Sequence, residues 1–184
     1  MSWIRTADAT LPPPADGRDP VSQSGMTSLL EALALHAPDL KATVEHGRAL
    51  MDDPSPLSNA QAELIAVVVS ATNGCGYCVA HYGPRLALAL GDEALARAVA
   101  RDYREANLAA RDRVLLDHAV ALTCEPSERK LEDVERVREY GFDDTAILRA
   151  THLAAWFGFV NRLASGLGVA LEPDIHEWEF GDQR

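Results

Sequence analysis

The stretch SNAQAELIAVVVSATNGCGYC, residues 58–78, decides the fold expected for this chain. Ser58 followed by Gln61 has the pattern of a capping box, in which the two side chains satisfy free backbone N–H groups at the start of a helix. After Glu63 the residues are almost all apolar. The valine triplet that follows is also compatible with a strand. The cap before it and the alanines around it favour a buried helix over residues 59–72.

The chain from Met26 onward has the same helical character. Ala, Leu, Glu and Arg, which are strong helix formers, recur throughout, and few stretches alternate as strands do. Breaks at Gly, Pro and acidic caps give further helices over 27–36, 39–51, 93–103, 109–123 and 131–140, and from a cap at Asp143 to near residue 163. Another helix begins at the CGYC stretch, and Gly83-Pro84 is expected to kink or restart it.

These patterns predict an all-α fold of about seven helices. Residues 25–184 are predicted to form a single all-α domain, and residues 1–24, rich in Pro, Asp, Ser and Gly, an extended N-terminal arm. A chain of 184 residues, 47% of them hydrophobic, is long enough to bury a sizeable core.

The acidic balance of the chain excludes several classes of partner. A formal net charge of −11 argues against nucleic acid and against an anionic membrane surface, because both would repel it. No apolar run approaches the ~20 residues of a membrane span, and the N-terminus has no apolar stretch of signal-peptide type. We therefore expect a cytoplasmic protein whose thiols are kept reduced.

Two of the three cysteines, Cys75 and Cys78, lie three residues apart, with His81 three residues further on. One interpretation is a zinc site completed by Cys124, but zinc sites usually contain a second ligand pair, and the sequence has none. A second interpretation is that the two thiols are core residues. Two features argue against it. The glycines on either side leave the backbone beside Cys75 uncrowded, and core-filling side chains are not needed at a helix start.

A redox pair fits the local physics best. The positive end of a helix dipole lowers the pKa of a thiol at the helix start, and residues i and i+3 share one face of the helix. Thiol chemistry also needs proton transfer. Glu63 is one candidate, because a carboxylate in an apolar helix has a raised pKa, although a glutamate in a first turn is also favoured by the dipole alone. His81, one turn after Cys78, is the other candidate.

The spacing of these residues resembles a known family. Glu63, Cys75 twelve positions later, then Cys78 and a nearby histidine resemble the alkylhydroperoxidase D family of the carboxymuconolactone decarboxylase-like superfamily, and especially its uncharacterised peroxidase-related branch. The likeness spans nearly the whole chain and is strongest over residues 54–90. The other matching stretches are Ser2-Trp3-Ile4-Arg5, Ser55-Pro56-Leu57-Ser58, Ile65-Ala66-Val67-Val68-Val69-Ser70, Tyr77-Cys78-Val79 and Phe159-Val160-Asn161-Arg162-Leu163.

This resemblance implies an AhpD-like helical fold, thiol-dependent reduction of peroxides, no metal or other cofactor, and a homo-oligomer. It also implies that Cys78 attacks the peroxide, that Cys75 resolves the product, and that Glu63 begins the proton relay. Dipole reasoning alone would choose Cys75 as the attacking thiol, because it is nearer the helix start. The family's histidine position is occupied here by Tyr82, and His81 lies one residue earlier. One residue turns a side chain by about 100° around a helix, so His81 is expected to point elsewhere and Tyr82 to offer a hydroxyl instead.

We therefore expect an antioxidant enzyme, a thiol peroxidase with a hydroperoxide as substrate and an external thiol or dithiol as reductant. Two alternatives remain at this point. One is a redox sensor or thiol-relay adaptor with little turnover, and the other is an enzyme like the superfamily's lactone decarboxylases, whose chemistry needs no second thiol. Cys124 has no partner spacing and is expected to be a packed thiol.

Overall fold

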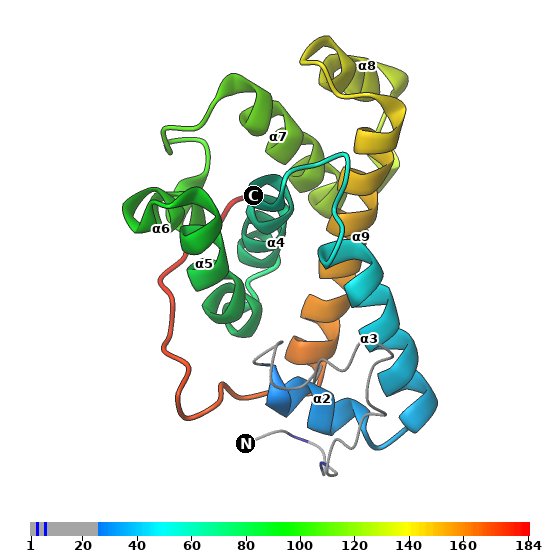
Figure 1. The fold of residues 1–184 in the computed structure, drawn as a ribbon, viewed down its shortest axis with the longest axis vertical. Coiled ribbons are helices and arrows are strands. Elements are labelled where there is room, and N and C mark those ends of the chain that lie inside the picture. The colour runs from blue at the N-terminus through cyan, green and yellow to red at the C-terminus, as the bar shows by residue number, and fades with distance from the viewer. Residues whose placement is uncertain (1–2, 4–5, 7–25) are drawn as a thin grey trace.

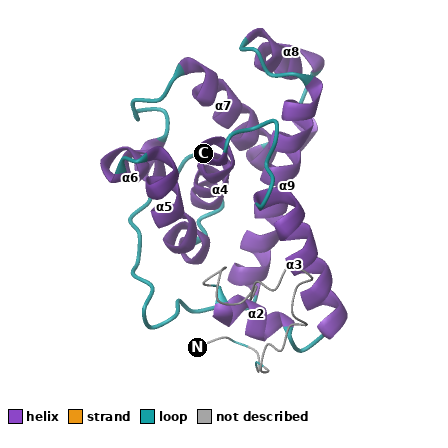
Figure 2. Cartoon of the chain, in the orientation of Figure 1, coloured by secondary structure: helices purple, strands orange, loops and turns teal. Residues whose placement is uncertain are grey.

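The computed structural model describes Trp3, Thr6 and residues 26–184, and the regular elements of this part of the chain are all helical (Figure 1, Figure 2). The eight α-helices are α2 (Thr27–Leu33), α3 (Ala37–Met51), α4 (Asn59–Thr72), α5 (Gly76–Leu90), α6 (Glu93–Asp102), α7 (Ala110–Cys124), α8 (Leu131–Glu139) and α9 (Asp144–Gly166). A 3-10 helix, η1 (Pro126–Glu128), follows α7. The all-α, AhpD-like fold predicted from the sequence is confirmed, with one helix more than expected.

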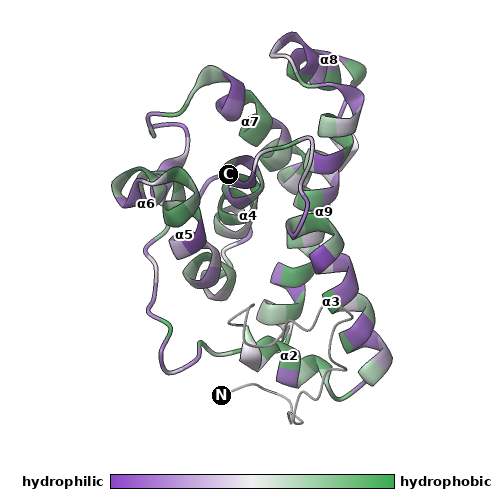
Figure 3. Ribbon diagram, viewed as in Figure 1, coloured by the Kyte–Doolittle hydropathy of each residue, from purple (hydrophilic) through white to green (hydrophobic). Residues whose placement is uncertain are grey.

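Helix α4 begins where the capping box predicts. The Gln61 N–H donates to Ser58 Oγ at 3.1 Å, and the Ser58 N–H donates to Gln61 Oε1 at 3.0 Å. The valines at 67–69 are fully buried within this helix, which packs against α5, α7 and α9. Burial on all sides offsets the modest helix propensity of valine. Apolar residues make up most of α4, whereas α8 carries many hydrophilic residues (Figure 3).

The helix that carries the cysteines does not restart at Gly83-Pro84, contrary to one of the two outcomes expected there. Helix α5 continues through Pro84 to Leu90, and Gly91, with φ +64°, ends it in the left-handed conformation. Proline costs a helix interior one hydrogen bond. Packing of α5 against α4 and α6 keeps the helix continuous despite that cost.

Helix α9, with 23 residues, is the longest in the described part of the chain and runs beside α3, α4 and α7 (Figure 1). Asp143 caps it as predicted, because its Oδ1 accepts a hydrogen bond from the Ala146 N–H at 2.7 Å. The helix ends at Gly166, three residues later than predicted. The chain then turns at Gly168, which has φ +59°.

The C-terminal tail, residues 169–184, has no helix and runs along the outer side of α5 and α6 (Figure 1). Gly181 donates its N–H to the Ala100 carbonyl at 3.1 Å, and the buried Gln183 side chain bonds to backbone groups of α6 and Tyr103. Trp178 packs on Gly83 of α5, where an added Cβ would lie only 2.6 Å from the indole ring.

The predicted N-terminal arm lies outside the described residues apart from Trp3 and Thr6. The Trp3 N–H donates to the Leu167 carbonyl at 2.9 Å. Among the described residues, none of the helices has the length and apolar character needed to span a membrane.

Candidate active site

The two cysteines lie at the first turn of α5. Cys75 is the N-cap residue, and Cys78 is the third residue of the helix. The turn before them is tight because Gly74 adopts φ +68°, which lets the Cys75 N–H donate to the Ser70 carbonyl at 2.9 Å. Both thiols are free and buried, with exposed fractions of 2% for Cys75 and 0% for Cys78.

The two thiols have opposite pKa shifts. Hydrogen bonding from the Cys78 thiol lowers the pKa of Cys75 to about 7 against the effect of burial, with further lowering by the Cys78 backbone, Ser165 and Asn161. The same pairing, together with burial, raises the pKa of Cys78 well above its ordinary value. The first negative charge of the pair therefore resides on Cys75.

A buried polar cluster from α9 and α4 lies beside the thiols. Asn161 donates through Nδ2 to Ser70 Oγ at 3.0 Å and accepts at Oδ1 from Asn73 Nδ2 at 2.9 Å. Asn161 also lowers the pKa of both cysteines. Its amide is held in one orientation by these two bonds, so it is a fixed dipole next to the sulfurs.

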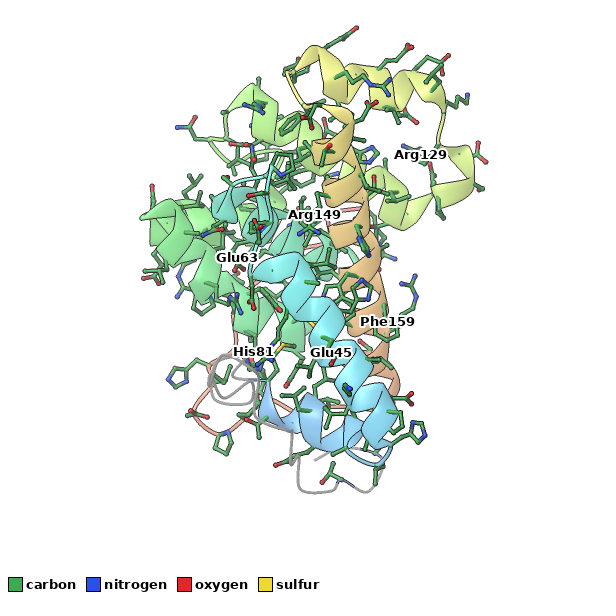
Figure 4. All side chains as sticks on the ribbon, turned by 45° about the vertical axis from the view of Figure 1, so that its right-hand side comes forward. Glu45, Glu63, His81, Arg129, Arg149 and Phe159 are labelled. Atoms are coloured by element: carbon green, nitrogen blue, oxygen red, sulfur yellow. The ribbon has the colours of Figure 1, made fainter. Side chains whose placement is uncertain are left out.

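Glu63 is buried on α4 (Figure 4). Arg85 of α5 donates from Nε to Glu63 Oε1 at 3.0 Å. Within the described residues Glu63 Oε2 has no hydrogen-bond partner. Burial raises the pKa of this carboxyl group, and the charge of Arg85 only partly opposes it. Glu63 therefore has a free oxygen and a raised proton affinity, as expected for a proton-transfer group.

His81 pairs with a different carboxylate from the one that Arg85 contacts. Its Nε2 lies 2.8 Å from Glu172 Oε2 of the C-terminal tail, and its ring contacts that of Tyr77, with centroids 4.6 Å apart. Burial lowers the pKa of His81, and Glu172 partly opposes this shift. Figure 4 shows His81 near α2, at the end of the molecule away from α8.

Tyr82 lies on the side of α5 that faces Glu63. Its ring packs edge-on against Phe157 with centroids 4.8 Å apart, and the Arg85 guanidinium lies 5.0 Å from its centre. Burial raises the pKa of Tyr82, and the charges of Glu63 and Cys78 raise it further. At neutral pH Tyr82 is therefore a protonated hydroxyl, able to donate a hydrogen bond but unsuited to act as a base.

Comparison with known proteins gives the family. The carboxymuconolactone decarboxylase family model matches residues 38–95. A peroxidase-related protein of uncharacterised function from Silicibacter sp. TM1040 is 30% identical over 96% of this chain and 97% of its own, with a TM-score of 0.78. The chain belongs to the AhpD-like, peroxidase-related branch of the carboxymuconolactone decarboxylase-like superfamily.

Other solved structures share this fold. The alkylhydroperoxidase AhpD core of an uncharacterised peroxidase-related protein from Ralstonia eutropha is 29% identical over 84% of this chain and 82% of its own, with a TM-score of 0.78. The debrominase Bmp8, solved as a cysteine-to-alanine variant with 2,3,4-tribromopyrrole, is 17% identical over 92% of this chain and 94% of its own. Its TM-score of 0.73 shows a shared fold only. No curated protein matches the sequence. The names of the matching relatives support a peroxidase-like enzyme in outline.

Several polar residues of this AhpD-like site were not predicted from the sequence. They are Tyr77, Arg85, Asn161 and Glu172. Asn161 lies in a stretch that resembles the family, and this likeness marked the position. It did not indicate that the side chain lies beside the thiols. Glu172 is 91 positions from His81 and lies in an irregular tail, so no spacing rule connects the two.

Cys124 corrects an expectation. The sequence predicts a packed thiol, but Cys124 is exposed, because it is the last residue of α7 and the chain turns there into η1. Among the described residues, no group of three or more His, Cys, Asp or Glu side chains is arranged to hold a metal ion.

Proposed function

We propose that this AhpD-like protein is a thiol peroxidase that reduces hydroperoxides through a dithiol–disulfide cycle of Cys75 and Cys78. The observation that carries the proposal is the coupled pair of free, buried thiols at the start of α5, one of which has a pKa of about 7. A lowered pKa makes a thiolate available at neutral pH, and that thiolate can act as a nucleophile or as a base for the second thiol. Membership of the peroxidase-related branch supports the same reaction.

The chemistry balances with one peroxide and two thiols. The attacking thiolate sulfur bonds to the distal peroxide oxygen, and the O–O bond breaks. The sulfur becomes a sulfenic acid, and the other oxygen leaves as an alcohol after taking a proton. The second thiol attacks the sulfenic sulfur, an S–S bond forms, and water leaves. An external dithiol or two thiols then reduce the disulfide and are themselves oxidised.

We assign the attack to Cys78 and the resolving role to Cys75, as the family resemblance implies. The opposite pKa shifts of the two thiols are compatible with this assignment if the Cys75 thiolate acts as the base that deprotonates Cys78. The proton of the Cys78 thiol moves to the Cys75 sulfur as Cys78 attacks. Burial keeps water from competing for that proton.

Proton supply is the proposed role of Glu63, Tyr82 and His81. The free Oε2 of Glu63, with its raised pKa, is suited to take the proton that Cys75 releases when it resolves the sulfenic acid. The Tyr82 hydroxyl, in the family's histidine position, is suited to donate a hydrogen bond to the leaving oxygen. His81 is the second base, held by the C-terminal tail.

The proposal is tested by mixing the reduced protein with one equivalent of a hydroperoxide. We expect loss of two thiols and a fall of about 2 Da per chain, since one disulfide forms with loss of two hydrogens. In Cys75→Ser, where Cys78 loses its base, the sulfenic acid should form more slowly, and a dimedone-type reagent should trap it on Cys78. In Cys78→Ser, neither disulfide nor trapped sulfenic acid should form.

The matched control is Cys124→Ser, which removes the exposed thiol and should leave peroxide consumption unchanged. A sulfenic acid on Cys75 in Cys78→Ser would reverse the assigned roles. Persistence of both thiols in the wild type would remove the peroxidase proposal. A sensor or adaptor would then be detected as a mixed disulfide with a partner. A decarboxylase-like enzyme would instead keep its activity after complete alkylation.

A further inference from the structure

The carboxylate of Glu172 joins three separate segments of the chain. Its Oε1 accepts hydrogen bonds from the Ser28 N–H at the start of α2 and from the Tyr77 hydroxyl of α5, both at 2.8 Å. Its Oε2 is 2.8 Å from His81 Nε2. The carboxylate is buried, with 9% of its residue surface exposed, so these partners replace its solvent.

The hydrogen bonds determine which nitrogen of His81 carries the proton. Burial alone would raise the pKa of Glu172, but the Ser28 N–H, the Tyr77 hydroxyl and His81 together lower it, so the group is ionised at neutral pH. An ionised carboxylate only accepts hydrogen bonds, so His81 must donate from Nε2. A neutral imidazole protonated at Nε2 has its lone pair at Nδ1. The basic nitrogen of His81 is therefore Nδ1.

We propose that Glu172 is a positioning residue that fixes the orientation and the Nε2–H tautomer of His81, so that Nδ1 is the nitrogen through which His81 acts as the second base of the proposed reaction. This inference deepens the proposed peroxidase function and rests on it for the identity of the reaction. The carboxylate of Glu63 is paired with Arg85. The carboxylate that orients His81 is that of Glu172, which belongs to the C-terminal tail. Docking of the tail is therefore what holds His81 in this orientation.

Other charged and titratable groups also lie around His81. Glu172 and Asp174 of the tail raise its pKa, Arg85 of α5 lowers it, and the Tyr77 ring contacts it at a tilted angle. Asp174 is exposed, and its influence is screened by solvent. Glu172 is thus the group in direct contact whose removal should alter His81 most.

Glu172→Gln is the sharpest test because the two side chains have nearly the same shape. The Ser28 N–H and the Tyr77 hydroxyl both donate to one carboxylate oxygen, so they should hold the amide oxygen of the glutamine at that place. Its NH₂ group then faces His81 Nε2 and donates to it. The imidazole proton must move to Nδ1, which inverts the tautomer as in the asparagine variant of a serine-protease triad.

The first readout is the pair of ring ¹⁵N shifts of His81 in ¹⁵N-histidine-labelled full-length protein. We expect an Nε2–H tautomer in the wild type and an Nδ1–H tautomer in Glu172→Gln. Glu177→Gln, an exposed glutamate in the same tail, and Tyr77→Phe should both keep the wild-type tautomer. A wild-type His81 protonated at Nδ1 would overturn the proposal, and this measurement needs no variant to fold.

The second readout is the pH profile of disulfide formation by peroxide. In Glu172→Gln the limiting rate should fall about 10-fold, a part of what a positioned base contributes. The acidic limb should move to lower pH, because the carboxylate that raises the pKa of His81 is gone. Against a His81→Ala background, Glu172→Gln should have no further effect. If the acidic limb of the pH profile does not move in Glu172→Gln, Glu172 has only a structural role. The same conclusion follows if Glu172→Gln lowers the rate equally in the His81→Ala background.

The two proposals fail in distinguishable ways. If the wild type does not react with peroxide, the peroxidase function falls, while the tautomer measurement still decides whether Glu172 sets His81. If peroxide reacts normally and the tautomer is unchanged in Glu172→Gln, only the positioning role falls.

Discussion

Cys75 and Cys78 have the same side chain and similar burial, yet their pKa values shift in opposite directions. Cys75 is at the N-cap, where the free N–H groups of the first turn favour negative charge, and the thiol of Cys78 is there to donate to it. The charge of a thiol pair is thus a property of both residues, since ionising one makes it harder to ionise the other.

This coupling predicts a titration. Ultraviolet absorbance at the thiolate band should show one ionisation with a midpoint of about 7 in the reduced wild type. In Cys78→Ala the largest cause of the lowered pKa is lost, so the midpoint should move up toward the ordinary value of about 8.5. Cys124→Ala should leave the midpoint where it is. An unchanged midpoint in Cys78→Ala would mean that the helix start alone, without the second thiol, stabilises the charge.

Helix α5 serves a different function on each face. One side presents Tyr82 to Glu63 and Phe157, while the adjacent side presents His81 to the tail. The tail reaches this helix because Gly83 leaves space for the Trp178 indole, which also lies under the Arg97 guanidinium at 4.0 Å. Helix α5 therefore carries the thiols and Tyr82 and also provides the surface on which the tail docks.

Gly83→Ala should loosen this docking. In a helix interior the change from glycine to alanine normally stabilises by about 0.5–1 kcal/mol. At Gly83 the new methyl group would lie 2.6 Å from Trp178, so we expect lower stability to denaturant and a shifted Trp178 indole N–H resonance. Gly166→Ala in α9, where an added Cβ meets no described atom within 4 Å, is the control and should be neutral or stabilising. Equal behaviour of the two variants would show that the tail is not seated on Gly83.

The stability of the whole molecule should respond to pH through its buried carboxylates. Glu63 has a raised pKa in the folded state, so between its ordinary value of 4.5 and the folded value the native protein binds more protons than the unfolded chain. Native stability therefore falls as pH rises through that window. Glu172 has a lowered pKa, and its contribution is instead lost as pH falls.

Comparison of wild type with Glu63→Gln isolates the first effect. The free energy of unfolding of the wild type, relative to that of the variant, should decrease as pH rises above 4.5 and then level off. The ion pair with Arg85 is already included in this net shift, because it strengthens as Glu63 ionises and opposes the effect of burial. Denaturant unfolding across this pH range is the measurement. A difference that grows with pH would mean that Arg85 outweighs burial.

The sequence by itself determined the helices and the thiol pair. Capping signals at Ser58 and Asp143 are local hydrogen-bond patterns, and the start of α5 follows from Gly74 and the residues after it. Local geometry also predicted that His81 and Tyr82 would point to different places. Such features depend on residues only a few positions apart, so they can be read without knowing the fold.

Only the tertiary structure decided what each of those side chains faces. The pairing of Glu63 with Arg85, the amide of Asn161 beside the sulfurs and the bond between His81 and Glu172 all join residues from different elements. Burial, which shifts the pKa values of these groups, is likewise produced by packing of the whole chain. A sequence pattern fixes the direction of a side chain on its own helix, but its partner depends on which other segment folds back against that helix.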